Sequence, residues 1–184
     1  MTGLALFVRE AITHPSAMGA IFPSSKRLAN ALAQQICTIK SGPIIELGAG
    51  TGAITAALLQ QKIPEHELIV IERSAKLAEH LNQRFPNIRV IQGDAGHLHQ
   101  LLDNISTPIQ AIVSSLPLRS LSLDSIEKIG GEINQVLQKN GLFIQYTYSL
   151  WGKPLAPSPY LKLIHHQWVW RNLPPARIDV FYRE

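Results

Sequence analysis

The stretch from Ile44 to Gly52 reads IIELGAGTG, a short apolar run that leads directly into a glycine-rich turn. Glycines at positions 48, 50 and 52 let the backbone turn tightly and pass close to a ligand, because no Cβ atom obstructs the approach. Residues 53–61 are rich in alanine and leucine, which is typical of a helix. A strand, a glycine loop and a helix in this order predict the nucleotide-binding corner of a doubly wound α/β sheet.

The size and charge of the chain narrow the possible partners. With 184 residues, 46% hydrophobic and 16% charged, we expect one ordered globular domain. The net charge of +4 favours an anionic partner, which can be a nucleic acid, a membrane surface or a phosphorylated small molecule. Cys37 is the single cysteine, so the sequence has neither a disulfide framework nor a thiol-based metal site.

The apolar segments favour a cytoplasmic protein that can contact a membrane from that side. No apolar stretch approaches the ~18 residues needed to span a bilayer, and no basic region precedes a long apolar block at the N-terminus. In the segment 4–12, Leu4, Phe7, Val8 and Ile12 recur at helical spacing. This short amphipathic helix either lies on a bilayer or packs on its own domain.

Strand-like and helix-like segments alternate along the rest of the chain, which predicts βαβ units and a mostly parallel sheet. Ser24 and Ser25 are candidate caps of a helix that runs to Ile36. We expect strands at 43–47, 68–71, 89–92, 111–116 and 141–148, and helices at 53–61, 75–84, 97–102 and 124–139. Two further strand-like runs, 166–171 and 177–182, flank a Pro-Pro turn and predict an antiparallel hairpin that closes the sheet.

The expected architecture is therefore a single α/β domain with a Rossmann-like doubly wound sheet. Residues 1–40 form N-terminal helices that cap the substrate and membrane side, and residues 41–184 form the core sheet.

The glycine loop resembles motif I of the class I S-adenosylmethionine-dependent methyltransferases, since its spacing is GxGxG and Glu46 stands two residues before Gly48. The resemblance implies S-adenosylmethionine as cofactor and methyl transfer as reaction. It assigns cofactor contacts to the glycine loop, to the ends of the next strands and to two serines: Glu46, Gly48, Ala49, Gly50, Thr51, Gly52, Glu72, Arg73, Asp94, Ala95, Ser25 and Ser115.

Simpler explanations exist for the same residues. The glycines can form a tight turn that binds no ligand. Glu72 ends the second strand, where a carboxylate can accept hydrogen bonds from both ribose hydroxyls, but it can also be a solvated strand end. Asp94 ends the third strand, where the methyltransferase pattern contacts the adenine amino group, and an aspartate there also caps the following helix.

The fourth strand ends in Ser115-Leu116-Pro117-Leu118-Arg119, in the place of the N-L-P-Y or N-P-P-Y motif of methyltransferases that act on adenine. Ser115 replaces the asparagine and Leu118 replaces the aromatic residue. Leu118 has no ring that could stack on a base. The departure favours a nitrogen nucleophile that is not part of a flat base.

Three segments resemble the bacterial phospholipid N-methyltransferases, which convert phosphatidylethanolamine stepwise to phosphatidylcholine and are distant relatives of the ribosomal RNA adenine dimethylases. The segments are 19–25 (GAIFPSS), 115–119 (SLPLR) and 170–176 (WRNLPPA). The resemblance implies methyl transfer to the head-group amine of a phospholipid. It places Ser115 among the catalytic residues, and Leu116 and Pro117 against the substrate.

Candidate residues for the amine and the phosphate follow from their chemistry. Tyr146 and Tyr148, on the predicted fifth strand, can present hydroxyls or ring faces to the amine and its cationic methylated forms, or they can be ordinary strand tyrosines. Arg119 matches the lipid phosphate, because a guanidinium binds phosphate in a bidentate way. The rival cations for the phosphate are Lys26, Arg27, Lys153 and Arg171.

Several alternatives stay open. The acceptor can be adenine in ribosomal RNA, another aminolipid such as ornithine lipid, or a small soluble amine; Leu118 and the lack of a concentrated basic patch or an RNA-binding domain count against RNA. The GxGxG spacing disfavours a nicotinamide-dependent oxidoreductase, and a non-catalytic cofactor-binding module is also compatible. No metal is expected, because adjacent His165 and His166 face opposite ways on a strand.

Overall fold

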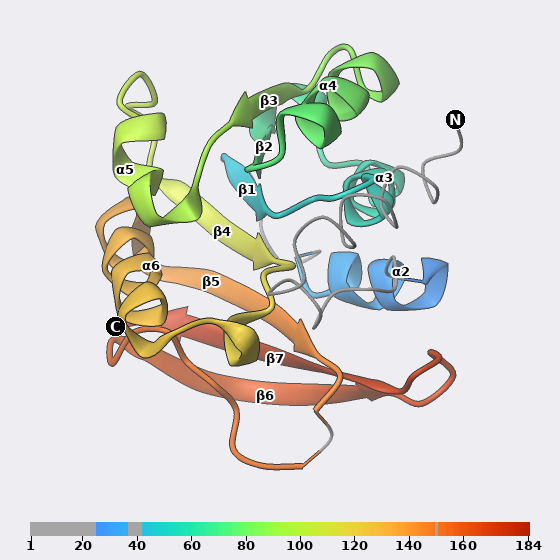
Figure 1. The fold of residues 1–184 in the computed structure, drawn as a ribbon, viewed down its shortest axis with the longest axis vertical. Coiled ribbons are helices and arrows are strands. Elements are labelled where there is room, and N and C mark those ends of the chain that lie inside the picture. The colour runs from blue at the N-terminus through green and yellow to red at the C-terminus, as the bar shows by residue number, and fades with distance from the viewer. Residues whose placement is uncertain (1–24, 37–41, 150) are drawn as a thin grey trace.

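The described residues of this computed structural model, 25–36, 42–149 and 151–184, build a seven-stranded sheet in the order β3-β2-β1-β4-β5-β7-β6 (Figure 1). The strands are β1 Ile44–Leu47, β2 Leu68–Glu72, β3 Arg89–Gln92, β4 Ile109–Ser114, β5 Leu137–Thr147, β6 Leu161–Val169 and β7 Ala176–Arg183. Strands β1 to β5 pair in parallel, and β7 pairs antiparallel with both β5 and β6. The predicted Rossmann-like sheet with an antiparallel C-terminal hairpin is confirmed.

Helices cover both faces of the sheet. They are α2 Lys26–Gln34, α3 Ala53–Gln60, α4 Ala75–Arg84, α5 Leu98–Leu101 and α6 Leu123–Val136, with short 3-10 helices η2 Glu65–Glu67, η3 Ala95–His97 and η4 Leu118–Ser120. Side chains of α2, α3 and α4 share one apolar core with Ile44, Val70 and Ile144. Side chains of α5 and α6 share the other core with Ile45, Ile71 and Phe143. The sheet thus has an apolar core on each face, as in a doubly wound fold.

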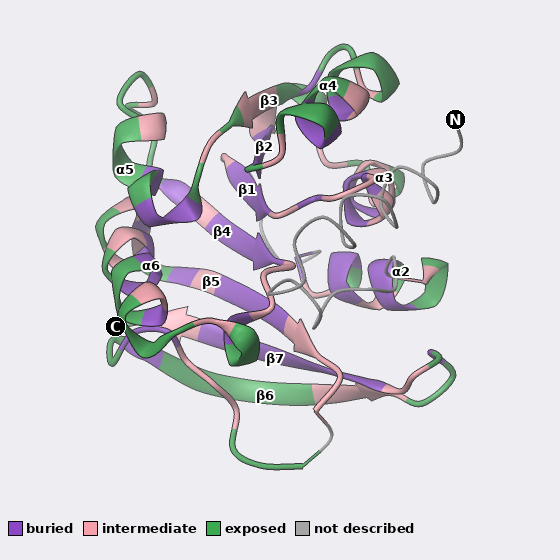
Figure 2. Ribbon diagram, viewed as in Figure 1, coloured by how far each residue is buried: buried purple, intermediate pink, exposed green. Residues whose placement is uncertain are grey.

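Burial follows the position of a strand in the sheet. All residues of the inner strands β1 and β2 are buried, whereas most of the edge strand β6 is exposed (Figure 2). Continuous apolar runs suit strands that are covered on both faces. Within the described ranges, no helix has the length and apolar character that a membrane crossing needs.

Some element boundaries differ from the sequence prediction. The helix predicted over 124–139 ends at Val136, because Leu137 pairs with Ile109 and begins β5. Strand β4 is shifted to 109–114, since the Leu116-Pro117 turn follows it. The predicted helix 97–102 is divided between η3 and α5.

The C-terminal hairpin starts earlier than predicted, and part of the N-terminal region lies outside the described residues. Strand β6 starts five residues earlier than predicted, at Leu161, and has a register shift between Leu163 and His165 that interrupts simple alternation. Ser25 caps α2, as predicted, by accepting a hydrogen bond from the Leu28 amide. The helix expected at 4–12, the segment 19–24 and the second candidate cap Ser24 lie outside the described residues.

Candidate active site

The glycine loop between β1 and α3 has a backbone conformation that would be strained for residues other than glycine. Gly48, Gly50 and Gly52 have φ of 71°, 59° and 81°, in the left-handed region that favours glycine. A Cβ atom on Gly52 would lie 2.5 Å from Phe85 and 2.8 Å from Leu81. The three glycines therefore put no side chain between the backbone of the loop and a ligand bound at the end of β1, next to the first turn of α3.

Glu46, on β1 just before this loop, is fully buried and only half satisfied. Its Oε2 accepts a hydrogen bond of 2.6 Å from Thr55 Oγ1, while its Oε1 has no partner among the described residues. Burial raises the pKa of Glu46 to about 7, against the lowering effect of the Thr55 hydrogen bonds. An unpaired carboxylate oxygen beside a glycine loop is suited to a ligand that carries a hydrogen-bond donor or a positive charge.

Glu72, at the end of β2, holds the glycine loop in place by a hydrogen bond to its backbone. Its Oε2 accepts from the Gly50 amide at 2.9 Å, and its Oε1 accepts from the Ser74 amide at 2.9 Å. The residue is 7% exposed, so it is not a solvated strand end. Each carboxylate oxygen has a further lone pair, so ribose hydroxyls remain compatible with this arrangement.

Asp94 follows β3 and caps η3. Its Oδ1 accepts from the Gly96 amide at 2.8 Å, and its Oδ2 lies 3.9 Å from Arg73 Nη1. The alternative that the sequence offered for Asp94, a helix cap, is therefore present. Its neighbour Ala95 is buried, while the side chains of Asp94 and Arg73 reach solvent. The adenine contact predicted for Asp94 stays a prediction.

A cavity opens at the carboxyl ends of β4 and β5. Its lining includes every residue that the sequence analysis assigned to catalysis or to substrate, namely Ser115, Leu116, Pro117, Arg119, Tyr146 and Tyr148. Gln145, Thr147, Ser149, Leu155 and Asp179 complete much of the remaining wall. The cavity adjoins the glycine loop: the Ser115 amide donates to the Leu47 carbonyl, and the Leu116 side chain lies against Gly48.

The two tyrosines form one aromatic wall. Tyr146 is near the end of β5 and Tyr148 follows its last residue, with ring centroids 5.5 Å apart and ring planes at 73°. Burial, together with the neighbouring Tyr146, raises the pKa of Tyr148 above its usual range, so its phenol is protonated at neutral pH. Electron-rich ring faces here are suited to a cationic nitrogen.

Asn172 connects this wall to the N-terminal helix. Its side chain contacts the Tyr148 hydroxyl, accepts a hydrogen bond from Ser25 Oγ and donates to the Pro174 carbonyl. Ser25, predicted to contact the cofactor, is thus bound to the β6–β7 turn. Sequence reasoning missed Asn172, although it is the one side-chain amide in the segment 170–176, WRNLPPA.

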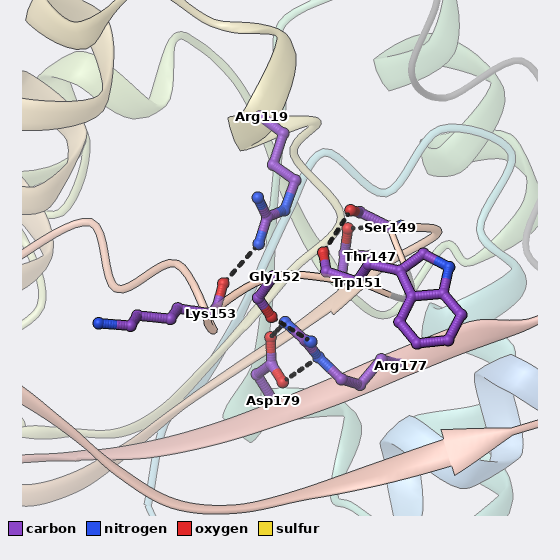
Figure 3. A network of polar contacts seen from close by, with 8 residues as sticks. All are labelled: Arg119, Thr147, Ser149, Trp151, Gly152, Lys153, Arg177 and Asp179. Atoms are coloured by element: carbon purple, nitrogen blue, oxygen red, sulfur yellow. Dashed lines mark hydrogen bonds and ion pairs between the residues drawn. The ribbon is translucent and has the colours of Figure 1, made fainter.

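Two arginines hold the segment after β5, residues 151–153, which we call the strap (Figure 3). Arg119 Nη2 donates to the Lys153 carbonyl at 2.6 Å, and Arg177 Nη1 donates to the Gly152 carbonyl at 2.9 Å. Arg177 also forms a buried bidentate ion pair with Asp179, at 2.7 and 3.0 Å. Arg119, the predicted phosphate ligand, therefore reaches the cavity wall and also fixes backbone there.

Three residues of this region gave no clear sequence signal: Gln145, Arg177 and Asp179. Gln145 and Asp179 are polar residues on the strands 141–148 and 177–182, and they face each other across the β5–β7 ladder. Their alternation with apolar neighbours was compatible with an exposed sheet face. No group of three or more potential ligands from histidine, cysteine, aspartate and glutamate lies together in the described ranges, so none offers a metal site.

The residues present fit S-adenosylmethionine. An unpaired Glu46 oxygen, a loop of glycines in the left-handed region and the buried Glu72 carboxylate surround the carboxyl ends of β1 and β2. This is the crevice where open α/β sheets bind nucleotides. The cavity at β4 and β5 lies beside it, where a methyl acceptor would have to sit.

The comparisons with known proteins agree with this geometry. The family model described as "Methyltransferase domain" matches residues 44–141, more than half of the chain. The chain is 30% identical over 180 residues to an ornithine lipid N-methyltransferase of Singulisphaera acidiphila, which covers 96% of this chain and 94% of that one. It is 34% identical over 73 residues to ribosomal RNA small subunit methyltransferase A of Parabacteroides distasonis, covering 40% of this chain and 26% of the relative.

Among solved structures, TrmN from Thermus thermophilus shares the fold with a TM-score of 0.71 at 17% identity, covering 92% of this chain and 52% of that one. The chain belongs to the class I S-adenosylmethionine-dependent methyltransferase family. It is an enzyme that uses S-adenosylmethionine as its methyl donor, as the glycine loop indicated.

Proposed function

We propose that this enzyme methylates the primary amine of a lipid head group, in the class that includes phosphatidylethanolamine and ornithine lipid. The observation that carries the proposal is the cavity at the ends of β4 and β5. It combines hydroxyl and amide oxygens with two tyrosine rings, whereas the position of the base-stacking aromatic is held by Leu118, 1% exposed. The similarity to a lipid N-methyltransferase over nearly the full length of both chains supports the same acceptor class.

In the proposed reaction, different residues of the chain bind the methyl donor and the methyl acceptor. When bound, S-adenosylmethionine supplies an electrophilic methyl group, to which the amine lone pair bonds while the carbon–sulfur bond breaks, its electron pair staying on sulfur and the nitrogen proton passing to solvent. Glu46 and Glu72 would hold the donor beside the glycine loop. The partly buried cavity disfavours a charged ammonium and so favours the neutral, nucleophilic amine. Tyr146 and Tyr148 would accommodate the cationic product.

A lipid acceptor also requires contact with a membrane surface. All three tryptophans lie within residues 151–170, and two exposed cations, Lys153 and Arg171, stand within two residues of Trp151 and Trp170 in the chain. Trp151 on the strap is 87% exposed, and Trp170 and Leu173 near the β6–β7 turn are 65% and 89% exposed. Exposed tryptophans among cations suit the interface of an anionic bilayer. This surface supports peripheral membrane association.

The test is methyl transfer from labelled S-adenosylmethionine to three acceptors in parallel. Anionic vesicles carry phosphatidylethanolamine in one reaction and ornithine lipid in another, and the third contains ribosomal RNA. We expect label in the lipid phase, suppressed by S-adenosylhomocysteine. Label in RNA alone would contradict the proposal and would mean that a base can bind without the aromatic residue that Leu118 replaces.

A further inference from the structure

Two buried oxygens at the cavity lack hydrogen-bond partners among the described residues: Ser115 Oγ and Gln145 Oε1. Gln145 lies on β5 and pairs in register with Ser114, the last residue of β4, which Ser115 follows directly. Gln145 is only 7% exposed, so its side-chain oxygen is not hydrogen-bonded to bulk water instead. Buried polar atoms in native proteins are normally paired, so both oxygens call for an explanation.

The orientation of the Gln145 amide is determined by its other end. Gln145 Nε2 donates to the Leu116 carbonyl at 3.2 Å, which leaves the oxygen as the unpaired atom. The Leu116 amide carbonyl also accepts from the Leu118 amide at 2.9 Å. The backbone carbonyl before Pro117 therefore has two donors already and is a poor acceptor for a third. The two side-chain oxygens remain for a ligand that donates hydrogen bonds.

Together these contacts point to a site for an amine. We propose that Ser115 Oγ and Gln145 Oε1 accept the two N–H bonds of the neutral primary amine and so direct its lone pair toward the methyl donor. This inference rests on the proposed function and adds Gln145, on β5, to the acceptor-binding residues. A neutral primary amine has two N–H donors and one lone pair, which matches two acceptor oxygens.

Because each methylation removes one N–H donor, the two oxygens contribute less to the rate of each successive transfer. After one transfer and loss of a proton, the neutral secondary amine has one N–H group left, and the tertiary amine has none. The two oxygens thus assist the first transfer most, the second less and the third not at all. A residue that only maintained the shape of the cavity would affect all three transfers alike.

Gln145→Met and Ser115→Ala each remove one oxygen at little change in side-chain size. We expect each to slow transfer to the unmethylated lipid by about fivefold to tenfold, the effect of one lost hydrogen bond. Transfer to the dimethylated lipid should stay within about twofold of wild type, on the same reasoning. Gln135→Met is the matched control, because Gln135 is an exposed residue of α6, and it should leave all rates unchanged.

The measurement is the single-turnover rate of each variant on the unmethylated, monomethylated and dimethylated forms of the lipid that wild type accepts. Thermal unfolding confirms that each variant is folded. If Gln145→Met does not fold, Gln145→Leu, which also lacks the side-chain oxygen, takes its place beside Ser115→Ala. A graded loss supports the inference. An equal loss on all three forms overturns it while the proposed function stands. No transfer by wild type to any aminolipid overturns both.

Discussion

Glu46 shows how burial of a single side chain changes its chemistry. Its carboxyl group is fully buried, has one hydroxyl donor and has a pKa raised to about 7 by burial. The folded chain therefore holds a proton at pH values where the unfolded chain has released it. Such a group makes the folded state less stable as the pH rises.

The pH dependence of unfolding tests this directly. Between pH 4.5 and about 7 the folded state binds the Glu46 proton more tightly than the unfolded state does. Raising the pH through this window should lower the free energy of unfolding by about 3 kcal/mol through this residue. Glu46→Gln removes the titration, so urea unfolding across the window should show a shallower pH dependence for the variant. Parallel curves for the two proteins would refute the assignment.

Helix α6 illustrates how packing decides between identical residues within one element. Gly130 and Gly131 are adjacent on this helix, but a Cβ on Gly130 would lie 1.8 Å from the Pro157 carbonyl oxygen. A Cβ on Gly131 would meet none of the described atoms within 4 Å. The close approach lets the segment before β6 cross α6, so Gly130 is fixed by packing and Gly131 is not.

Alanine substitutions at the two positions should have opposite effects. Gly130→Ala should lower the free energy of unfolding by roughly 1–3 kcal/mol, because backbone must move to make room. Gly131→Ala should raise it by about 0.5–1 kcal/mol, since alanine favours a helix over glycine. Chemical denaturation of both variants measures the difference. Equal effects of the two would show that the Pro157 contact does not constrain α6.

At the scale of the molecule, Arg177 joins several aromatic side chains beyond the carboxyl end of β5. Arg177 lies over the Trp168 ring, and Trp168 stacks on Trp170 with centroids 5.3 Å apart. Arg177 also binds the strap at Gly152, beside the exposed Trp151. The proposed membrane surface is therefore connected through Arg177 to Asp179, which lines the proposed acceptor cavity.

Vesicle binding tests that surface separately from catalysis. Trp151→Ala and Trp170→Ala should each weaken partitioning onto anionic vesicles by about tenfold, the effect of one large apolar side chain left in water. Tyr160→Ala is the control, because Tyr160 is exposed but precedes the opposite end of β6. Sedimentation with lipid that has no amine head group measures binding alone. Unchanged partitioning would place the membrane contact elsewhere, for example on residues 4–12.

The sequence by itself determined the strand, glycine loop and helix around Gly48, the alternation of the other elements and the class of enzyme. These features depend on neighbouring residues, since backbone freedom, apolar periodicity and capping act over a few positions. Only the tertiary structure decided where α6 gives way to β5, because Leu137 suits a helix or a strand until it pairs with Ile109.

The same division applies to the site. Glu72 could be placed at a strand end from sequence, but its bond to the Gly50 amide 22 residues away could not. The bonds of Asn172 to Ser25, and of Arg177 to Gly152, likewise join residues far apart in the chain. Gln145 became a candidate only when its amide nitrogen was found on Leu116 and its oxygen without a partner among the described residues. Local sequence sets which groups are available, and the folded chain sets which of them are left unpaired at the cavity.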